Sequence, residues 1–191
     1  MYGSSPDPYV FSGTDVLINL ANIRDGAQLE RFEFYATQQR ASEPLPRGRY
    51  GYRHFRAVHK HLFQDVDSWA GKPRTVRLSK HQSVFCYPEH IDSEMTRLFS
   101  ELAAEGHLCA RSSVQFVKRA AYYLSEWNAV HAFREGNGRT QLLFLTLIAE
   151  HAGHAIKADR IDPALVLAAM IASFGGKTKP LETQIARWIE P

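Results

Sequence analysis

Apolar residues recur at three- and four-residue spacing through most of the chain, and this spacing limits the possible fold more than any other feature. Between Tyr52 and Ala70 the spaced apolar residues fall on one face of a helix. They are Tyr52, Phe55, Val58, Leu62, Phe63, Val66 and Trp69. Gly71 and Pro73 follow, and we expect them to end this helix. Such segments have to bury their apolar faces against one another, which favours a helical bundle.

The same pattern predicts six more helices. Their expected ranges, taken from apolar spacing and from breaking residues at the ends, are 27–43, 91–105, 114–128, 137–151, 163–173 and 181–189. Residues 1–26 contain Pro6, Pro8 and Gly13 with few periodic apolar positions, so we expect an irregular N-terminal arm there. The chain is therefore predicted to be all-α.

One segment has the pattern of strands instead. In RTVRLSKHQSVFCY, residues 74–87, apolar residues flank the polar turn SKHQS, which is typical of a short β-hairpin. With 191 residues, the chain has enough length for one well-packed domain. We therefore expect a single domain over residues 1–191, built from helices and one small hairpin.

Composition excludes several classes of protein. The net charge of +3 is spread along the chain without a basic run, so we expect no direct binding to nucleic acid. The two cysteines, Cys86 and Cys109, lie outside any spacing typical of zinc ligands, and two are too few for a disulfide framework. No signal peptide and no run of eighteen apolar residues is found, so we expect a cytoplasmic protein without a membrane span.

The stretch HAFREGNGR, residues 131–139, joins two predicted helices and concentrates residues suited to phosphate chemistry. The N-terminus of a helix offers unpaired N–H groups and the positive end of the helix dipole, which favour a phosphate. Gly136 and Gly138 let a ligand approach the main chain closely. Arg139 would oppose the dipole if it served only the helix, so its position favours a bound anion.

Three more residues of this stretch suit a metal–nucleotide site. Glu135 supplies the carboxylate that Mg²⁺ takes beside phosphate oxygens. His131 can accept a proton near neutral pH and is a candidate general base. Phe133 is expected to turn inward and to anchor the loop on the core. Taken singly, a loop histidine, a Gly-Asn-Gly turn or an Arg–Glu pair is more often structural than functional.

The order of these residues resembles the signature H-x-F-x-[DE]-G-N-G-R of the Fic (Fic/Doc) family. The matching residues are His131, Phe133, Glu135, Gly136, Asn137, Gly138 and Arg139. Residues 58–86 are similar to the family's helix, its WAG turn and the hairpin called the flap, and residues 7–19 resemble the N-terminal arm of short bacterial members. The resemblance implies the Fic fold, a helical bundle with a β-hairpin flap, with residues 131–142 as the catalytic loop and helix start.

The resemblance also implies an activity. Fic proteins are mostly adenylyltransferases that move AMP from Mg-ATP onto a Ser, Thr or Tyr hydroxyl of a target protein. By this likeness His131 deprotonates the hydroxyl, and Glu135 holds Mg²⁺ between the α- and β-phosphates. Asn137, with the amides around Gly136 and Gly138, forms the anion hole. Arg139 contacts the β-phosphate and helps pyrophosphate to leave.

The flap has its own implied role. In the family this hairpin pairs with an extended segment of the target by β-augmentation, which recognises main chain and so serves varied targets. In this chain the segment runs from about Ser79 to Phe85. Lys80 and Phe85 are the residues that we expect to contact the target; the alternative is an ordinary hairpin packed on its own core.

The chain departs from the family pattern at two positions. Ala132 stands where proline is usual, and Leu142 stands where the full signature has a second arginine that engages the γ-phosphate region. Loss of one charged hydrogen bond commonly costs on the order of 1.5–3 kcal/mol, so we expect slow or altered transfer. The inhibitory pattern [ST]-x-x-x-E-[GN] is absent from the sequence, and members that lack it typically receive the inhibitory helix from a small antitoxin protein.

Three functions are therefore open at this stage. The first is a protein adenylyltransferase, as the toxin of a toxin–antitoxin pair or as an effector delivered into a host cytosol. The second is a Fic enzyme with attenuated activity or another phosphate donor, because of Leu142. The third is a non-catalytic Fic scaffold that binds a partner protein through its flap. Retention of His131 and Glu135 argues against the third.

Overall fold

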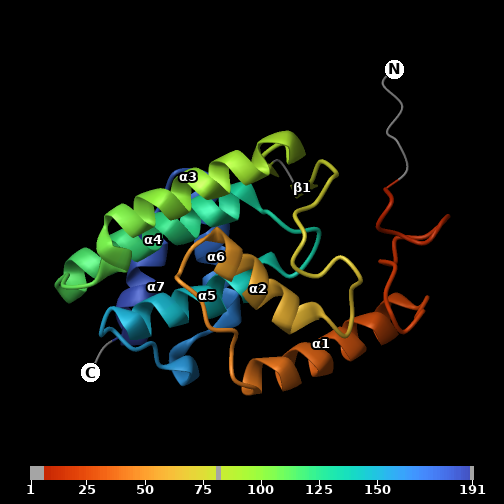
Figure 1. Cartoon of the computed structure of the whole chain (residues 1–191), viewed down its shortest axis with the longest axis horizontal. Helices are drawn as coiled ribbons and strands as arrows, with labels where there is room; N and C mark the ends of the chain where they lie inside the picture. The colour runs from red at the N-terminus through yellow and green to blue at the C-terminus, as the bar shows by residue number, and fades with distance from the viewer. Residues whose placement is uncertain (1–6, 81–82, 190–191) are drawn as a thin grey trace.

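The computed structural model describes residues 7–80 and 83–189, and within them the chain is an all-α bundle with one small hairpin (Figure 1). The seven α-helices of this part are α1 Gly26–Ser42, α2 Tyr52–Phe63, α3 Ile91–Ala104, α4 Ser113–Val130, α5 Asn137–His151, α6 Pro163–Phe174 and α7 Lys179–Ile189. Short 3₁₀ turns lie at Pro88–His90, Gly106–Leu108 and Ala158–Arg160. The predicted fold class is confirmed, and α5 has the bounds that the sequence indicated.

The described part of the N-terminal arm is irregular and leads into α1. Residues 7–25 contain one isolated bridge, between Val10 and Leu17. Asp25 caps α1, because its carboxylate accepts a hydrogen bond from the N–H of Gln28 at 2.8 Å. From this cap α1 runs along α2, and the arm and α1 together lie on one side of the molecule (Figure 1).

Helix α2 is shorter than the apolar spacing predicted. It ends at Phe63, and residues 64–71 form a series of turns instead of continuing to Ala70. The N–H groups of Val66 and Asp67 both donate to the carbonyl of Phe63, which tightens the chain into a turn. The prediction was wrong because Val66 and Trp69 are buried by these turns and not by a helix face. Asp65, Asp67 and Ser68 favour such turns, since short polar side chains compete with helical hydrogen bonds.

The hairpin forms with two very short strands. Strand β1, Ser79–Lys80, pairs antiparallel with β2, Ser83–Val84, so that Ser79 faces Val84 and Lys80 faces Ser83. The turn at residues 81–82 and the side chain of Lys80 lie outside the described residues. The paired segment falls inside the predicted range 74–87, and its strands are shorter than the apolar pattern indicated.

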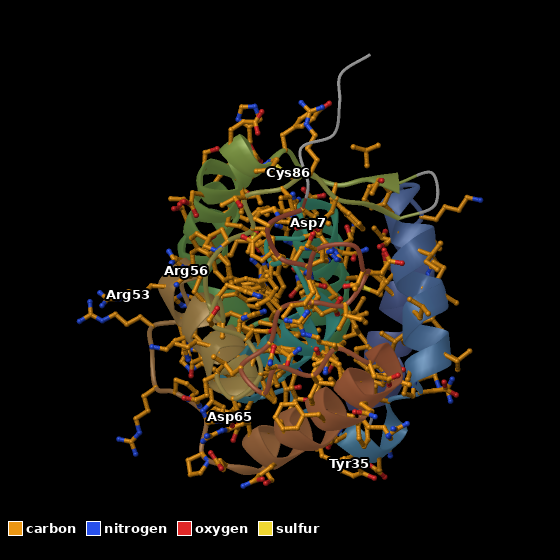
Figure 2. The ribbon with its side chains drawn as sticks, turned by 90° about the vertical axis from the view of Figure 1, so that its right-hand side faces the viewer. Asp7, Tyr35, Arg53, Arg56, Asp65 and Cys86 are labelled. Carbon is orange, nitrogen blue, oxygen red and sulfur yellow. The ribbon has the colours of Figure 1, made fainter. Side chains whose placement is uncertain are left out.

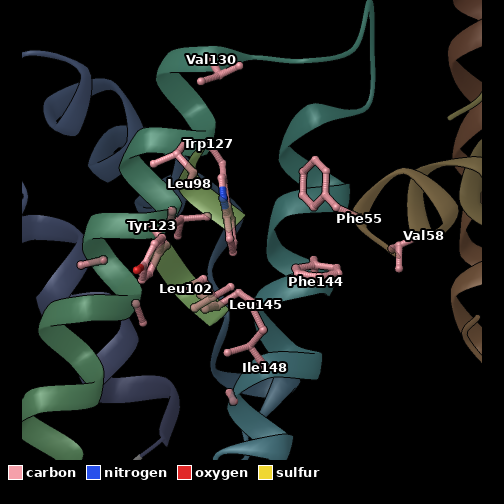
Figure 3. Packing of buried hydrophobic residues seen from close by; sticks show 14 of the residues in the cluster. Phe55, Val58, Leu98, Leu102, Tyr123, Trp127, Val130, Phe144, Leu145 and Ile148 are labelled. Carbon is pink, nitrogen blue, oxygen red and sulfur yellow. The ribbon is translucent and has the colours of Figure 1, made fainter. Parts of the chain in front are cut away.

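Aromatic side chains fill the centre of the bundle. Trp127 of α4 stacks on Phe99 of α3 at 5.4 Å and meets Phe144 of α5 edge-on at 5.8 Å. Phe55 of α2 reaches the same cluster, 5.7 Å from Trp127 (Figure 3). Such pairs add roughly 0.5–1.5 kcal/mol each to the burial of their area. The helices that carry the candidate loop, α4 and α5, are therefore fixed against α2 and α3.

One further observation concerns membranes. Within residues 7–80 and 83–189, every helix is too short or too polar to cross a bilayer.

Candidate active site

The end of α4 places His131 in an unusual conformation. His131 caps this helix with φ 52° and ψ 62°, the left-handed region that non-glycine residues rarely adopt. Its N–H still donates to the carbonyl of Trp127 at 2.9 Å, so the last turn of the helix is closed. The chain direction changes at this residue, and the imidazole, half-buried, lines a cavity above the next loop.

Phe133 and Asn137 hold the loop that follows. The ring of Phe133 is fully buried, as predicted for an anchor, and stacks on Phe55 at 5.5 Å. The amide of Asn137 accepts a hydrogen bond from the N–H of Phe133 at 2.9 Å and donates to its carbonyl at 2.8 Å. The oxygen and the nitrogen of the Asn137 amide group therefore both bind the main chain of Phe133 and close the loop. Its role toward an anion stays a prediction.

His59 of α2 supports the loop from the side of the core, although no local sequence signal marks it as part of the site. Its Nε2 lies 3.0 Å from the carbonyl oxygen of Glu135, and its Nδ1 accepts the N–H of Gly71 at 2.9 Å. Burial, with a smaller contribution from the charge of Arg139, lowers the pKa of His59 to about 4. The imidazole is therefore neutral at pH 7, with its proton on Nε2 toward Glu135.

Gly136 starts α5 and is required for steric reasons. It has φ 75°, and a Cβ atom there would lie 2.1 Å from Cζ of Phe63. The first turn of α5 then leaves the N–H groups of Asn137, Gly138 and Arg139 without intrahelical acceptors. Around Gly138 the space is open, because a Cβ atom there would meet nothing within 4 Å. The helix start thus presents amides beside accessible space, as expected of an anion site.

Glu135 lies at the rim of two cavities. The first is about 530 Å³ and is also lined by His131, Asn137 and Gly138. The second is about 620 Å³ and lies against the N-terminal arm and α1. The Glu135 carboxylate is 47% exposed and accepts the N–H of Gly136 at 2.9 Å. The same carboxylate lies 3.8 Å from the guanidinium of Arg139, so part of it is already paired and nearly half of the side chain is open to a ligand.

Arg139 points away from the first cavity. Its guanidinium pairs with Glu33 of α1, donates to the hydroxyl of Thr37 at 3.2 Å and lies over the ring of Phe63 at 4.7 Å. It lines the second cavity together with Glu33 and Glu135. His131 and Arg139 are thus separated by Glu135, and contact of Arg139 with a β-phosphate stays a prediction.

The first cavity has a polar half and an apolar half. The polar half is the loop with His131, Glu135 and the start of α5. The apolar half is formed by the flap and α6, through Leu78, Phe85, Val166, Leu167, Met170, Ile171 and Phe174. Asn128 of α4 lies between the halves and donates to the carbonyl of Met170 at 3.2 Å. Such a cavity suits a ligand that has a flat, largely apolar group for the apolar half and phosphates for the polar half.

The flap is tied to this cavity by Phe85. Its ring is 9% exposed, stacks on the imidazole of His131 at 3.9 Å and meets Phe174 of α6 edge-on at 5.4 Å. Val84 beside it is exposed. Contact of Phe85 with a target stays a prediction, because most of its surface is already covered by His131 and Phe174.

Leu142 occupies the second turn of α5 and also lines the first cavity. It is half-buried and packs against the core. The position of the family's second arginine thus faces the candidate site, as the sequence comparison implied, with an apolar side chain in its place.

A buried carboxyl lies near the charged residues of the second cavity. Asp67 is 2% exposed, and among residues 7–80 and 83–189 neither of its oxygens has a hydrogen-bond partner. Burial raises the pKa of Asp67 to about 8, with smaller contributions from the charges of Glu33 and Glu135. Burial likewise raises the pKa of Glu33, against the opposing effect of Arg139. No sequence signal marked Asp67 or Glu33, because both depend on contacts made only in the fold.

The sequence was compared with known proteins. The profile of the Fic/DOC family matches residues 50–149. The chain is 47% identical over 189 residues to "Probable protein adenylyltransferase y4lH" of Sinorhizobium fredii, with 98% of each chain covered. It is 39% identical over 190 residues to "Protein adenylyltransferase VbhT" of Bartonella schoenbuchensis, covering 97% of this chain and 40% of that longer protein.

The structure was compared in the same way. The crystal structure of BepC from Bartonella tribocorum, determined with bound AMPPNP, superposes with a TM-score of 0.86 at 23% identity and covers 96% of both chains. At this identity the likeness concerns the fold, and it extends over nearly the whole chain.

Proposed function

This chain belongs to the Fic/DOC family and is a protein adenylyltransferase, and we propose that its reaction takes place in the cavity between the flap, α6 and the loop at residues 131–136. One observation carries the proposal: His131, Glu135 and the open N-terminus of α5 line the same cavity. A base, a metal-binding carboxylate and a phosphate site are the three groups that transfer of a nucleotidyl group requires.

His131 is the general base. The hydroxyl oxygen of the target attacks the α-phosphorus, its proton moves to the imidazole of His131, and the bond to the bridging oxygen breaks to release pyrophosphate. The ring of Phe85 stacks on the imidazole, and the N–H of His131 closes the last turn of α4 on Trp127, so contacts hold both the ring and the backbone of His131. Such restriction supports catalysis, because the base has to be aligned with the attacking oxygen.

Glu135 is the residue suited to hold Mg²⁺. Within residues 7–80 and 83–189, no three His, Cys, Asp or Glu side chains gather in a way that could bind a metal alone. A single half-exposed carboxylate beside a phosphate site fits Mg²⁺ that arrives with a nucleotide, since this ion takes one or two carboxylates and completes its shell with phosphate oxygens and water. When bound, the ion neutralises charge that develops on the leaving pyrophosphate.

The start of α5 receives the phosphates. Amides of the first helical turn and the helix dipole attract them, and the open space at Gly138 allows close approach. Because Glu135 borders both cavities, a polyphosphate that begins beside His131 reaches Arg139 by passing Glu135. The apolar half of the first cavity, formed by the flap and α6, receives the base.

Labelling with radioactive or alkyne-tagged ATP tests this function. Purified protein, ATP, Mg²⁺ and bacterial lysate are incubated, and labelled proteins are separated on a gel. We expect at least one labelled band that disappears with His131→Ala and is strongly weakened with Glu135→Gln. Thermal shifts with ATP measure whether the His131→Ala variant still binds nucleotide, and we expect that it does. Labelling that persists in His131→Ala would rule out the proposed base.

A second candidate donor follows from Leu142. An apolar side chain that lines the first cavity in place of an arginine removes a positive charge from the wall of that cavity. A nucleoside diphosphate conjugate has no γ-phosphate. It would therefore lose less binding free energy than ATP when this arginine is absent. A thermal-shift series with ATP, ADP, GTP, CTP, UTP and a diphosphate-linked donor distinguishes them, because the donor in use gives the largest stabilisation.

The partners remain part of the proposal. The target is a protein with an accessible Ser, Thr or Tyr hydroxyl next to an extended segment that can pair with the edge of the flap. A small antitoxin protein is the expected inhibitor, because the sequence has no inhibitory motif of its own. We place the reaction in the cytoplasm, or in a host cytosol if the protein is exported. Affinity purification of the His131→Ala variant from its native cell tests for the inhibitor.

A further inference from the structure

Arg74 is a buried cation that joins the flap to the catalytic loop. It lies between the end of α2 and the flap and is 2% exposed. Its Nε donates to the carbonyl of His131 at 2.8 Å, and its Nη2 donates to the carbonyls of Val130 at 3.1 Å and Cys86 at 2.6 Å. Its Nη1 donates to the carbonyl of Val76 at 2.6 Å. One guanidinium thus holds both sides of the flap and the end of α4.

The chemistry of these contacts is unusual for a buried charge. Among the described residues, every hydrogen bond of the guanidinium ends on a main-chain carbonyl, and burial lowers the pKa of Arg74. The carbonyls of Val130 and His131 lie at the C-terminus of α4, where the helix dipole is negative and stabilises a cation. The charge is therefore placed where α4 ends and the catalytic loop begins.

Two contacts act on His131 from the flap side. Arg74 fixes its carbonyl oxygen, and Phe85 covers one face of its imidazole at 3.9 Å with the two planes 17° apart. His131 has a positive φ, and a strained backbone of this kind persists only when the surroundings hold it in place. Two main-chain bonds reinforce the junction: the N–H of Arg74 to Ala132 at 2.9 Å and the N–H of Cys86 to Ala129 at 3.2 Å.

We propose that Arg74 and Phe85 are positioning residues that set the orientation of His131 from the base of the flap. This inference rests on the proposed role of His131 as general base. Arg74 holds the backbone of His131 in its left-handed conformation, and Phe85 holds the ring. Because the same guanidinium anchors Val76 and Cys86, the target-binding edge of the flap and the base keep a fixed spacing. Figure 2 shows that Cys86 lies toward the end of the molecule opposite Tyr35 of α1.

The variants Arg74→Gln, Arg74→Lys and Phe85→Leu test the proposal. Arg77→Gln is the matched control, since Arg77 carries the same charge in the same segment, is exposed and lies over Tyr87. A misplacement of about 1 Å lowers turnover by about 100-fold, so we expect kcat to fall by about that factor in Arg74→Gln and less in Arg74→Lys. The Kd for ATP should change less than threefold in each variant.

A spectroscopic readout separates orientation from general damage. With ¹³C- and ¹⁵N-labelled histidine, the ring signals of His131 are assigned by their loss in His131→Ala. We expect them to shift in Phe85→Leu, because the stacked ring is removed, and to shift or broaden in Arg74→Gln. The signals of His59 and His154, which lie in other contacts, should stay in place. Arg77→Gln should move none of them.

Several outcomes would overturn the proposal. One is unchanged kcat with unmoved His131 signals in a folded Arg74→Gln protein. Another is equal loss of ATP binding and displacement of all histidine signals, which would indicate a general structural role. If Arg74→Gln does not fold, Arg74→Lys and Phe85→Leu decide by the same criteria. If wild-type protein labels no target, the proposed function fails, and the His131 signals still test the orientation.

Discussion

The imidazole of His59 lies against the ring of Phe133, with 3.8 Å between the ring centroids and 30° between the planes. This contact joins α2 to the loop at residues 131–136, where we propose that the reaction takes place. The same imidazole reaches the carbonyl of Glu135 and the N–H of Gly71, so one side chain supports both the loop and the turn after α2. The position of Glu135, the proposed ligand of Mg²⁺, therefore depends on a neutral histidine that does not line the first cavity.

Replacing His59 by leucine should destabilise the protein strongly. The change leaves the carbonyl of Glu135 and the N–H of Gly71 buried without their partners, and each lost contact costs roughly 1–3 kcal/mol. We expect the free energy of unfolding to fall by about 2–6 kcal/mol, measured by urea denaturation at pH 7.5. His90→Leu, at an exposed position, is the control. A loss below 0.5 kcal/mol in His59→Leu would contradict this assignment.

The two glycines of the loop should respond very differently to alanine. In Gly136→Ala the new Cβ meets the ring of Phe63 at 2.1 Å and the backbone keeps a φ of 75°, so we expect a lower melting temperature and loss of ATP binding. Gly138→Ala adds its Cβ in open space within the first turn of α5, so its melting temperature should stay within about 2 °C of wild type. Differential scanning fluorimetry with and without ATP measures both. Equal effects of the two changes would contradict the steric argument.

Much of the fold follows from local sequence, and the exceptions have a physical cause. The start of α5 at Asn137 was predictable because a Gly-Asn-Gly turn admits the positive φ that begins the helix. The end of α2 could not be predicted in this way. Val66 and Trp69 continue the helical spacing in the sequence, but they are buried by the turns that follow the helix. The apolar pattern indicates that a residue is buried, but it does not indicate whether that residue lies in a helix or in a turn.

The candidate site divides in the same way. His131, Glu135 and the glycines were found from nine consecutive residues, since one loop places them together. Contact of Arg139 with a phosphate stays a prediction, and its ion pair with Glu33 had no local signal, because Glu33 lies more than a hundred residues away on α1. Arg74 carries no local signal either, because its partners are carbonyls of three separate segments. Such contacts can be read only from the fold.

Removing the Glu33 carboxylate should strengthen binding of ATP. The ion pair with Glu33 holds Arg139 against α1, so Glu33 competes with the phosphates of ATP for the guanidinium. Glu33→Gln removes the negative charge and weakens this competition. A partly exposed pair is worth about 0.2–1 kcal/mol, so we expect the Kd for ATP to fall by up to about fivefold. The Kd for AMP, which has no β-phosphate, should not change. Isothermal titration calorimetry measures both constants.

Glu30→Gln is the matched control for this change, because Glu30 is an exposed carboxylate of the same helix that also borders the second cavity. If Glu30→Gln strengthens ATP binding as much as Glu33→Gln does, the effect comes from general charge and not from release of Arg139.

Asp67 should make stability depend on pH. Its folded pKa is raised to about 8 from an ordinary value of 3.8, so the folded state binds a proton more tightly than the unfolded state. The stability linked to this group is complete below pH 3.8 and is lost as the pH rises through 8. Asp67→Asn removes the titration. We expect the variant to gain stability relative to wild type between pH 5 and pH 8, by on the order of 2–4 kcal/mol.

Urea denaturation of both proteins at half-unit pH steps measures this difference. His59 has a lowered pKa, so its contribution to the free energy of unfolding falls as the pH drops from 6.5 to about 4, opposite to that of Asp67. His59 is present in both proteins, so its contribution cancels in the difference. A difference that stays constant with pH would show that Asp67 does not titrate in this range.

Restoring a charge at position 142 should change the use of nucleotides. Leu142→Arg places a guanidinium at the wall of the first cavity, on the helix whose N-terminus receives the phosphates. One charged hydrogen bond is worth about 1.5–3 kcal/mol, so we expect the Kd for ATP to fall by about 10- to 100-fold, with a smaller change for ADP and none for AMP. Leu142→Met keeps the apolar volume and is the control. If the Kd values for ATP and AMP fall by the same factor, the new charge attracts nucleotides in general, and residue 142 does not face the γ-phosphate.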